Sequence, residues 1–175
     1  KIEKFAGKFI ENIFLIIESD ANFQVNICIK KKNYDKLINK KTLENTLTEV
    51  KDLFKEAYQD QIIMHMIINN FLINGKNYNS YIDNLRSDNL CLEVKFLSIS
   101  NNVAISLEKI LEKYQIKIKQ YLNARYIKNF TKVDNIKIPE MAYMLKNGYN
   151  NNEVILVPKN KENKGFFEKF FQLFS

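Results

Sequence analysis

Hydrophobic residues recur every three or four positions in several stretches of the chain, a spacing that gathers them on one face of a helix. The clearest stretch is residues 41–59, whose apolar face is formed by Leu43, Leu47, Val50, Phe54, Ala57 and Tyr58. Residues 2–11 show the same spacing. So do residues 101–114, which begin with two asparagines that can cap a helix and carry the stripe Val103, Leu107, Ile110, Leu111 and Tyr114. The pattern predicts a helix in each of the three stretches.

Other stretches alternate apolar and polar residues or hold short unbroken apolar runs, and both patterns are typical of strands. The unbroken run at residues 13–17 is rich in β-branched side chains and predicts a strand buried on both faces. Further strands are predicted at residues 25–29, 61–73, 90–97 and 116–119. Lysines interleave with the isoleucines of the last one, so it is expected to lie at a sheet edge.

Polar segments separate these elements. Residues 30–35 are expected to form a turn, residues 76–89 a loop, and Asn74 with Gly75 a hairpin turn. After residue 130 the pattern changes, and Pro139 predicts the start of a helix that runs to about Lys146.

The predicted order through residue 123 is helix, strand, strand, helix, strand, strand, helix, strand. Such mixing predicts an α+β fold in which a small mixed or antiparallel sheet carries helices packed on one face. At 175 residues the chain is near the usual size of one domain. We therefore expect an interaction domain over residues 1–130, an extension and linker over residues 131–164, and an amphipathic helix over residues 165–175.

The C-terminal segment is the main candidate for a binding site. A helix there would gather the five rings of Phe166, Phe167, Phe170, Phe171 and Phe174 on one side and leave Lys164 and Lys169 on the other. Burial of even half of each ring would contribute several kcal/mol, which suffices for reversible attachment to an anionic bilayer surface. Alternatively, the rings pack as a terminal helix on the domain's own core. The polar linker at residues 159–164 favours a separable segment.

The charge of the chain narrows the choice of partner. A net charge of +7 and an isoelectric point near 9.2 suit a phosphate-rich partner, either nucleic acid or an anionic membrane. The positive charge comes almost entirely from lysine, and Arg86 and Arg125 are the only arginines. Because arginine is the preferred residue for reading phosphates and bases, this composition disfavours nucleic acid.

No membrane-spanning run and no signal peptide are predicted, so we expect a cytoplasmic protein.

The sequence offers no constellation typical of an enzyme. Phosphate loops need closely spaced glycines, whereas Gly7, Gly75, Gly148 and Gly165 are isolated. His65 is the only histidine and lies between methionines in an apolar strand, so we expect a half-buried imidazole satisfied by a neighbouring strand or loop. Cys28 and Cys91 are far apart in sequence and are expected to be reduced core thiols. We therefore expect no catalysis, no cofactor and no metal site.

Several short motifs, in one order, resemble the bacterial cell-division protein FtsA, an actin-like family. They are IEKFAG at 2–7, IFL at 13–15, IMHM at 63–66, FLING at 71–75, LEVKF at 92–96, LEKILEK at 107–113 and IKI at 116–118. The final phenylalanine-rich segment resembles the amphipathic tail of FtsA. The resemblance covers about residues 2–126 and the tail. It does not extend to the glycine-rich phosphate strand and the later ATPase subdomains of FtsA.

The resemblance implies the strand-helix-strand-strand module that FtsA inserts in place of an actin subdomain and uses to contact division proteins and neighbouring subunits. It implies a non-catalytic adaptor, peripheral on the cytoplasmic face of the inner membrane, with self-association as a further property. ATP binding and FtsZ binding are not implied. The alternative from the residues alone is a basic RNA-binding or ribosome-associated protein of an AT-rich genome.

Overall fold

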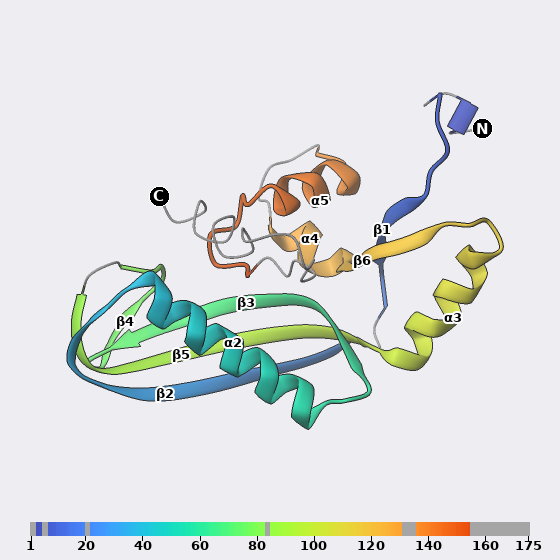
Figure 1. Cartoon of the computed structure of the whole chain (residues 1–175). Helices are drawn as coiled ribbons and strands as arrows, with labels where there is room; N and C mark the ends of the chain where they lie inside the picture. The colour runs from blue at the N-terminus through green and yellow to red at the C-terminus, as the bar shows by residue number, and fades with distance from the viewer. Residues whose placement is uncertain (1–2, 5–6, 20–21, 83–84, 131–135, 155–175) are drawn as a thin grey trace.

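A computed structural model describes residues 3–4, 7–19, 22–82, 85–130 and 136–154. Its elements in chain order, labelled as in Figure 1, are β1 (Asn12–Ile17), β2 (Phe23–Ile38), α2 (Lys40–Ala57), β3 (Gln61–Ile73), β4 (Lys76–Tyr78), β5 (Leu85–Ser100), α3 (Asn101–Glu112), β6 (Lys117–Asn123), α4 (Ala124–Phe130) and α5 (Ile138–Lys146). This arrangement confirms the expected α+β class. The helix predicted at residues 165–175 lies outside the described residues.

The main sheet is antiparallel and has the strand order β2-β5-β3-β4. Its central strand, β5, pairs with β2 from Phe23 opposite Ser98 to Ile38 opposite Leu85. The other edge of β5 pairs with β3, and a short bridge between Ile67 and Glu153 adds the segment after α5 to the outer edge of β3. The order of β2, α2, β3 and β5 along the chain is strand, helix, strand, strand, with β4 as a small addition.

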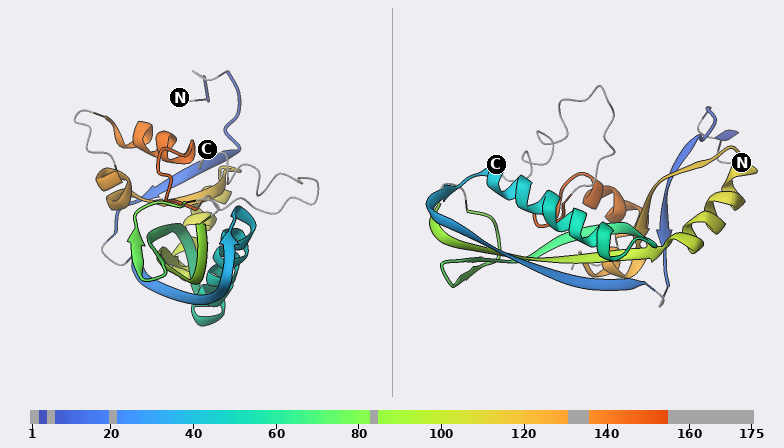
Figure 2. Two further views of the ribbon diagram at one scale, coloured as in Figure 1. Left: turned by 90° about the vertical axis from the view of Figure 1, so that its left-hand side faces the viewer. Right: turned by 60° about the horizontal axis from the view of Figure 1, so that its bottom comes forward.

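Helix α2 crosses one face of this sheet (Figures 1 and 2). Asn39 caps its start, where the side-chain oxygen Oδ1 accepts the backbone N–H of Thr42 at 3.0 Å. Of the predicted apolar face, Leu43, Leu47, Val50 and Phe54 are buried against the sheet, whereas Ala57 is exposed. The rings of Phe54 and Phe96 stack with centroids 4.5 Å apart. The alternating residues of β2 and β5 complete this core with their inward-facing side chains, among them Val25, Ile27, Leu90, Leu92 and Val94.

Strands β1 and β6 form a second, parallel two-stranded sheet beyond the end of the main sheet. On one side Leu15, Ile17 and Tyr121 pack with Ala104 of α3. On the other, Ile16 and Leu122 pack with α4 and α5. The expectation that β1 is buried on both faces is therefore not met: residues 15–17 are half-buried between the two clusters, and Phe14 is 45% exposed.

The prediction of a turn at residues 30–35 is wrong, because strand β2 continues through these residues. After a bulge the strand pairs again, with Lys36 opposite Ser87, and Tyr34 takes a positive φ of 53° within the irregular stretch. Ile38 is buried in the main core at the far end of β2. Residues 30–35 thus lie inside a strand, and the apolar residues before and after them pack in the main core.

The loop expected at residues 76–89 is also shorter than predicted. The Asn74–Gly75 turn is confirmed, with φ of 50° and 78°, and β4 follows it at once. The Asn74 side-chain oxygen accepts the backbone N–H of Asp88 at 2.9 Å, which ties the turn to the start of β5. Backbone pairing and polar side chains hold this region, so hydrophobic periodicity does not reveal it.

The helix expected at residues 2–11 is not observed over residues 7–11. Gly7 has a φ of 64°, a left-handed conformation that ends any helix before it. The backbone N–H of Ile10 donates to Glu3 Oε1 at 3.0 Å. The chain then enters β1 directly.

The packing of α2 predicts a large difference between two leucines on the same helix. Leu43 is fully buried, whereas Leu53 is 43% exposed. Leu43→Ala should lower the free energy of unfolding by about 2–5 kcal/mol, since it leaves a cavity in the main core. Leu53→Ala is the matched control and should cost less than about 1 kcal/mol in the same urea titration. Equal losses would contradict the observed orientation of α2.

Candidate functional site

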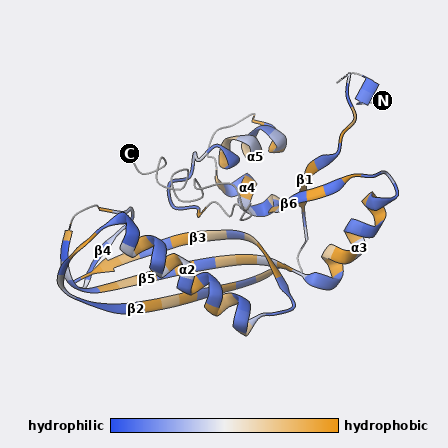
Figure 3. Cartoon of the chain, viewed as in Figure 1, coloured by the Kyte–Doolittle hydropathy of each residue, from blue (hydrophilic) through white to orange (hydrophobic). Residues whose placement is uncertain are grey.

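Helix α3 leaves most of its apolar stripe in solvent. Ala104 is the buried residue of this helix, while Val103 and Ile110 are 47% and 56% exposed. Tyr114, just after the helix, is 70% exposed. Figure 3 shows hydrophobic positions along α3, which projects beyond the end of the main sheet. An exposed apolar stripe on a helix is a feature of binding surfaces, since a helix that only supports the fold buries it.

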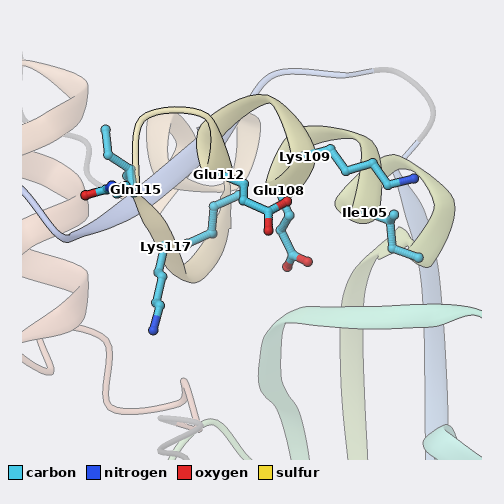
Figure 4. Close-up of a pocket in the computed structure, with 8 residues that line it drawn as sticks. Ile105, Glu108, Lys109, Glu112, Gln115 and Lys117 are labelled. Carbon is cyan, nitrogen blue, oxygen red and sulfur yellow. The ribbon is translucent and has the colours of Figure 1, made fainter.

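A groove of about 610 Å³ lies between α3 and the start of β6 (Figure 4). Its apolar lining is Ile105, Ile116 and Ile118, and its charged lining is Glu108, Glu112, Lys109 and Lys117. In Figure 4 the side chains of Glu108 and Glu112 lie next to each other along α3. The groove therefore offers an apolar wall with carboxylates along one side.

One edge of β6 borders this groove. The backbone N–H of Lys117 donates to the carbonyl of Glu11 at 2.8 Å, so the backbone of Lys117 faces β1. Successive residues of a strand point their N–H and C=O groups to opposite edges, so those of Ile118 face away from β1. In the described part of the chain no strand pairs with that edge at residues 117–119. The edge strand predicted at residues 116–119 is thus observed as the first half of β6.

A buried tyrosine holds the carboxylate of Glu108 in position. The hydroxyl of the buried Tyr121 donates to Glu108 Oε1 at 2.8 Å. Burial, and next the hydrogen bond to Glu108, raise the pKa of Tyr121 well above its ordinary value, so the phenol stays a donor at neutral pH. Glu112, one turn further along α3, is exposed. The groove therefore combines an apolar wall with two carboxylates and two lysines.

His65 lies at a buried junction between the two sheets. The ring is 1% exposed, its Nε2 accepts the backbone N–H of Asn123 at 2.8 Å, and its Nδ1 lies 2.6 Å from Glu153 Oε1. Because a backbone N–H can only donate, the hydrogen of the imidazole is on Nδ1 and points to Glu153. Tyr126 donates to the other carboxylate oxygen at 3.0 Å. Burial, followed by the nearby Glu153 charge, raises the pKa of Tyr126.

This junction has a structural role. Both ring nitrogens of His65 are occupied by protein groups and the ring is closed to solvent, so it cannot reach a substrate. The expectation that neighbouring segments satisfy the imidazole is confirmed, but the ring is fully rather than half buried. Sequence periodicity could not identify Glu153, because its contact with His65 spans 88 positions.

The two cysteines were expected to be separate core thiols, and this is wrong. Their Sγ atoms lie 2.6 Å apart, and Cys28 is exposed on the face of the main sheet that α2 does not cover. A signal was present in the sequence: Cys28 stands between Ile27 and Ile29, and Cys91 between Leu90 and Leu92. In an alternating strand these are the phases that point away from the core.

The binding segment predicted from the sequence lies outside the described residues. It comprises Lys164, Phe166, Phe167, Lys169, Phe170, Phe171 and Phe174. The last described residues, Asn152 to Val154, are bound to the edge of β3: Ile68 N–H donates to the Asn152 carbonyl and Val154 N–H to the Met66 carbonyl, both at 2.8 Å. The predicted segment therefore follows a point that is fixed to the main sheet.

Comparison with known proteins adds no relative. No protein-family model matches the sequence, and no curated protein is similar to it. Among the described residues, no group of three or more His, Cys, Asp or Glu side chains could hold a metal ion. None of the helices in the described ranges is long and apolar enough to cross a membrane. The candidate functional sites are the α3 surface, the groove beside β6 and the cysteine pair.

The contact between His65 and Glu153 is expected to hold the segment after α5 against β3. Glu153→Ala removes the acceptor of the buried Nδ1–H and should cost about 1–3 kcal/mol of stability. It should also speed hydrogen exchange at the amides of Ile68 and Val154, which pair with the opposite chain segment. Glu153→Gln is the matched control: its amide oxygen can still accept from His65, so exchange should change much less. Identical exchange rates in both variants would contradict this role.

Proposed function

We propose that this chain is a non-catalytic adaptor of bacterial cell division, similar to the interaction module of FtsA. It binds other division proteins through α3 and the groove beside β6. It attaches peripherally to the cytoplasmic face of the inner membrane through residues 165–175. The observation that carries the proposal is the exposed apolar stripe of α3, centred on Ile110.

The α3 surface supports a particular mode of binding. An extended segment of a division protein can pair with the open backbone edge of β6 around Ile118 and lay alternate side chains into the groove. The apolar wall suits an apolar side chain of that segment, and the exposed Glu112 suits a lysine or arginine next to it. Backbone pairing supplies affinity in such complexes, while the side-chain sites supply specificity.

The topology supports the resemblance to FtsA. The strand-helix-strand-strand order of β2, α2, β3 and β5 is that of the module that FtsA inserts into its actin-like fold. The strands that precede and follow it, β1 and β6, lie side by side and parallel. The chain thus leaves a small sheet, builds the module and returns to the same sheet, as expected for an inserted unit.

The membrane part of the proposal rests on the five phenylalanines of the tail. The full chain should co-sediment with vesicles that contain anionic phospholipid and less well with neutral vesicles, because the protein carries a charge of +7. Phe167→Glu combined with Phe170→Glu should weaken binding at least about tenfold, since each change removes a ring and adds a like charge to the membrane.

A double variant with a larger added negative charge elsewhere controls for electrostatics. Lys109→Glu with Lys113→Glu changes exposed residues outside the tail by a larger charge. It should keep more vesicle binding than the phenylalanine variant. If the intact chain stays in the supernatant with anionic vesicles, the membrane role fails.

The α3 part is tested separately, with the fluorescently tagged full chain in the cells that produce it. Ile110→Glu places a charge in the exposed stripe and should abolish enrichment at division sites while membrane fluorescence remains. Asn102→Glu adds the same charge at an exposed polar position of the same helix and should leave enrichment unchanged. Loss of enrichment in both variants, or in neither, would argue against docking on this stripe.

A further inference from the structure

The cysteine pair is placed by the register of β2 and β5. Cys28 lies opposite Glu93, and Cys91 lies opposite Lys30, so the two cysteines are diagonal neighbours on one face of an antiparallel pair. Their sulfur atoms are 2.6 Å apart. Cys28 is exposed and Cys91 is half-buried. Two thiols that are already in contact and open to solvent are well placed to react with each other.

We propose that Cys28 and Cys91 form a reversible disulfide by exchange with a low-molecular-weight disulfide. The Cys28 thiolate attacks one sulfur of the incoming disulfide, for example oxidised glutathione; the S–S bond breaks and one glutathione thiolate leaves. The Cys91 thiolate then attacks the Cys28 sulfur and expels the second glutathione thiolate. The two cysteines lose two electrons and two protons in total, and the glutathione disulfide gains them as two thiols.

The surroundings assign the order of the two steps. Cys28 is the more exposed sulfur and therefore receives the incoming disulfide. Burial, then the contact with Cys28, raises the pKa of Cys91 to about 11, with Lys30 acting to lower it and Glu93 to raise it. Once Cys28 is in the mixed disulfide, its thiol no longer raises the pKa of Cys91. Cys91 then becomes easier to ionise at the point where it must attack.

Polar side chains lie beside the cysteine pair and hold one another in position. Glu93 accepts hydrogen bonds from Asn70 at 2.6 Å and from Asn26 at 3.2 Å, so its carboxylate is held by amides beside the pair. Lys30 is exposed on the other diagonal. A diagonal pair is wider than a directly opposed one, yet the two sulfur atoms already lie 2.6 Å apart. Because Cys28 is exposed, the disulfide is open to thiols and easier to reduce than a buried structural disulfide.

Oxidation would covalently join β2 to the central strand β5 across 63 positions of the chain. The loop that it closes contains α2 and β3 and so most of the main core. A crosslink of this length restricts the unfolded chain, and the melting temperature of the oxidised form should be higher by about 5–10 °C.

The test uses the full chain, reduced and then incubated with excess oxidised glutathione. Intact mass should show the loss of two hydrogens with no glutathione attached, and a peptide that links residues 28 and 91. Cys91→Ser should accumulate one stable glutathione adduct on Cys28, because no second thiol can expel it. Cys28→Ser should react more slowly, since Cys91 is half-buried with a raised pKa.

Several results would overturn the proposal: two glutathione adducts on the wild-type chain, a disulfide between two chains, or unreacted thiols. The double variant Cys28→Ser with Cys91→Ser provides the stability control. Its melting temperature should be the same with and without the oxidant. An equal shift in that variant would show that the stabilisation does not come from the disulfide.

Discussion

The imidazole of His65 joins three parts of the molecule that are far apart in sequence. It stands on β3 of the main sheet, accepts a hydrogen bond from the end of β6 at Asn123 and donates one to Glu153 after α5, while its ring packs against Tyr126 with centroids 4.6 Å apart. Because the ring is buried, losing any partner would leave a polar atom unsatisfied. This junction and the apolar cluster of Met64, Ile99, Ala104 and Tyr121 together hold the β1 and β6 layer against the main sheet.

Helices α2 and α3 show how the same hydrophobic spacing serves two purposes. The stripe of α2 meets a broad antiparallel sheet and is buried, with Leu43 and Phe54 in the main core. The stripe of α3 meets only a small cluster where β6 lies against the ends of β3 and β5, which covers Ala104 and part of Leu107 and leaves Ile110 in solvent. The apolar stripe of α3 is therefore longer than the surface that its neighbours can cover. The part that stays exposed is the docking surface that we propose for the adaptor.

Local pattern predicted the elements well wherever apolar residues alternate or recur. It located α2, β3 and α5 within a few residues and also the Asn74–Gly75 turn. It failed where long-range backbone pairing holds polar residues in a strand, as at residues 30–35 of β2, and where a single glycine, Gly7, ends a helical pattern. Such errors share one cause: periodicity reports the burial of side chains, and these segments are fixed by main-chain hydrogen bonds and dihedral angles instead.

The sequence by itself determined the α+β class and the apolar residues of α2 from Leu43 to Phe54, because these depend on the spacing of neighbouring residues. Tertiary structure alone decided that the two cysteines touch, that His65 meets Glu153, and that the stripe of α3 stays exposed. The first two require pairing between segments separated by 63 and 88 positions. The third depends on how much surface the neighbouring elements can cover. No local pattern carries that information, since strand register and packing are set by the whole chain at once.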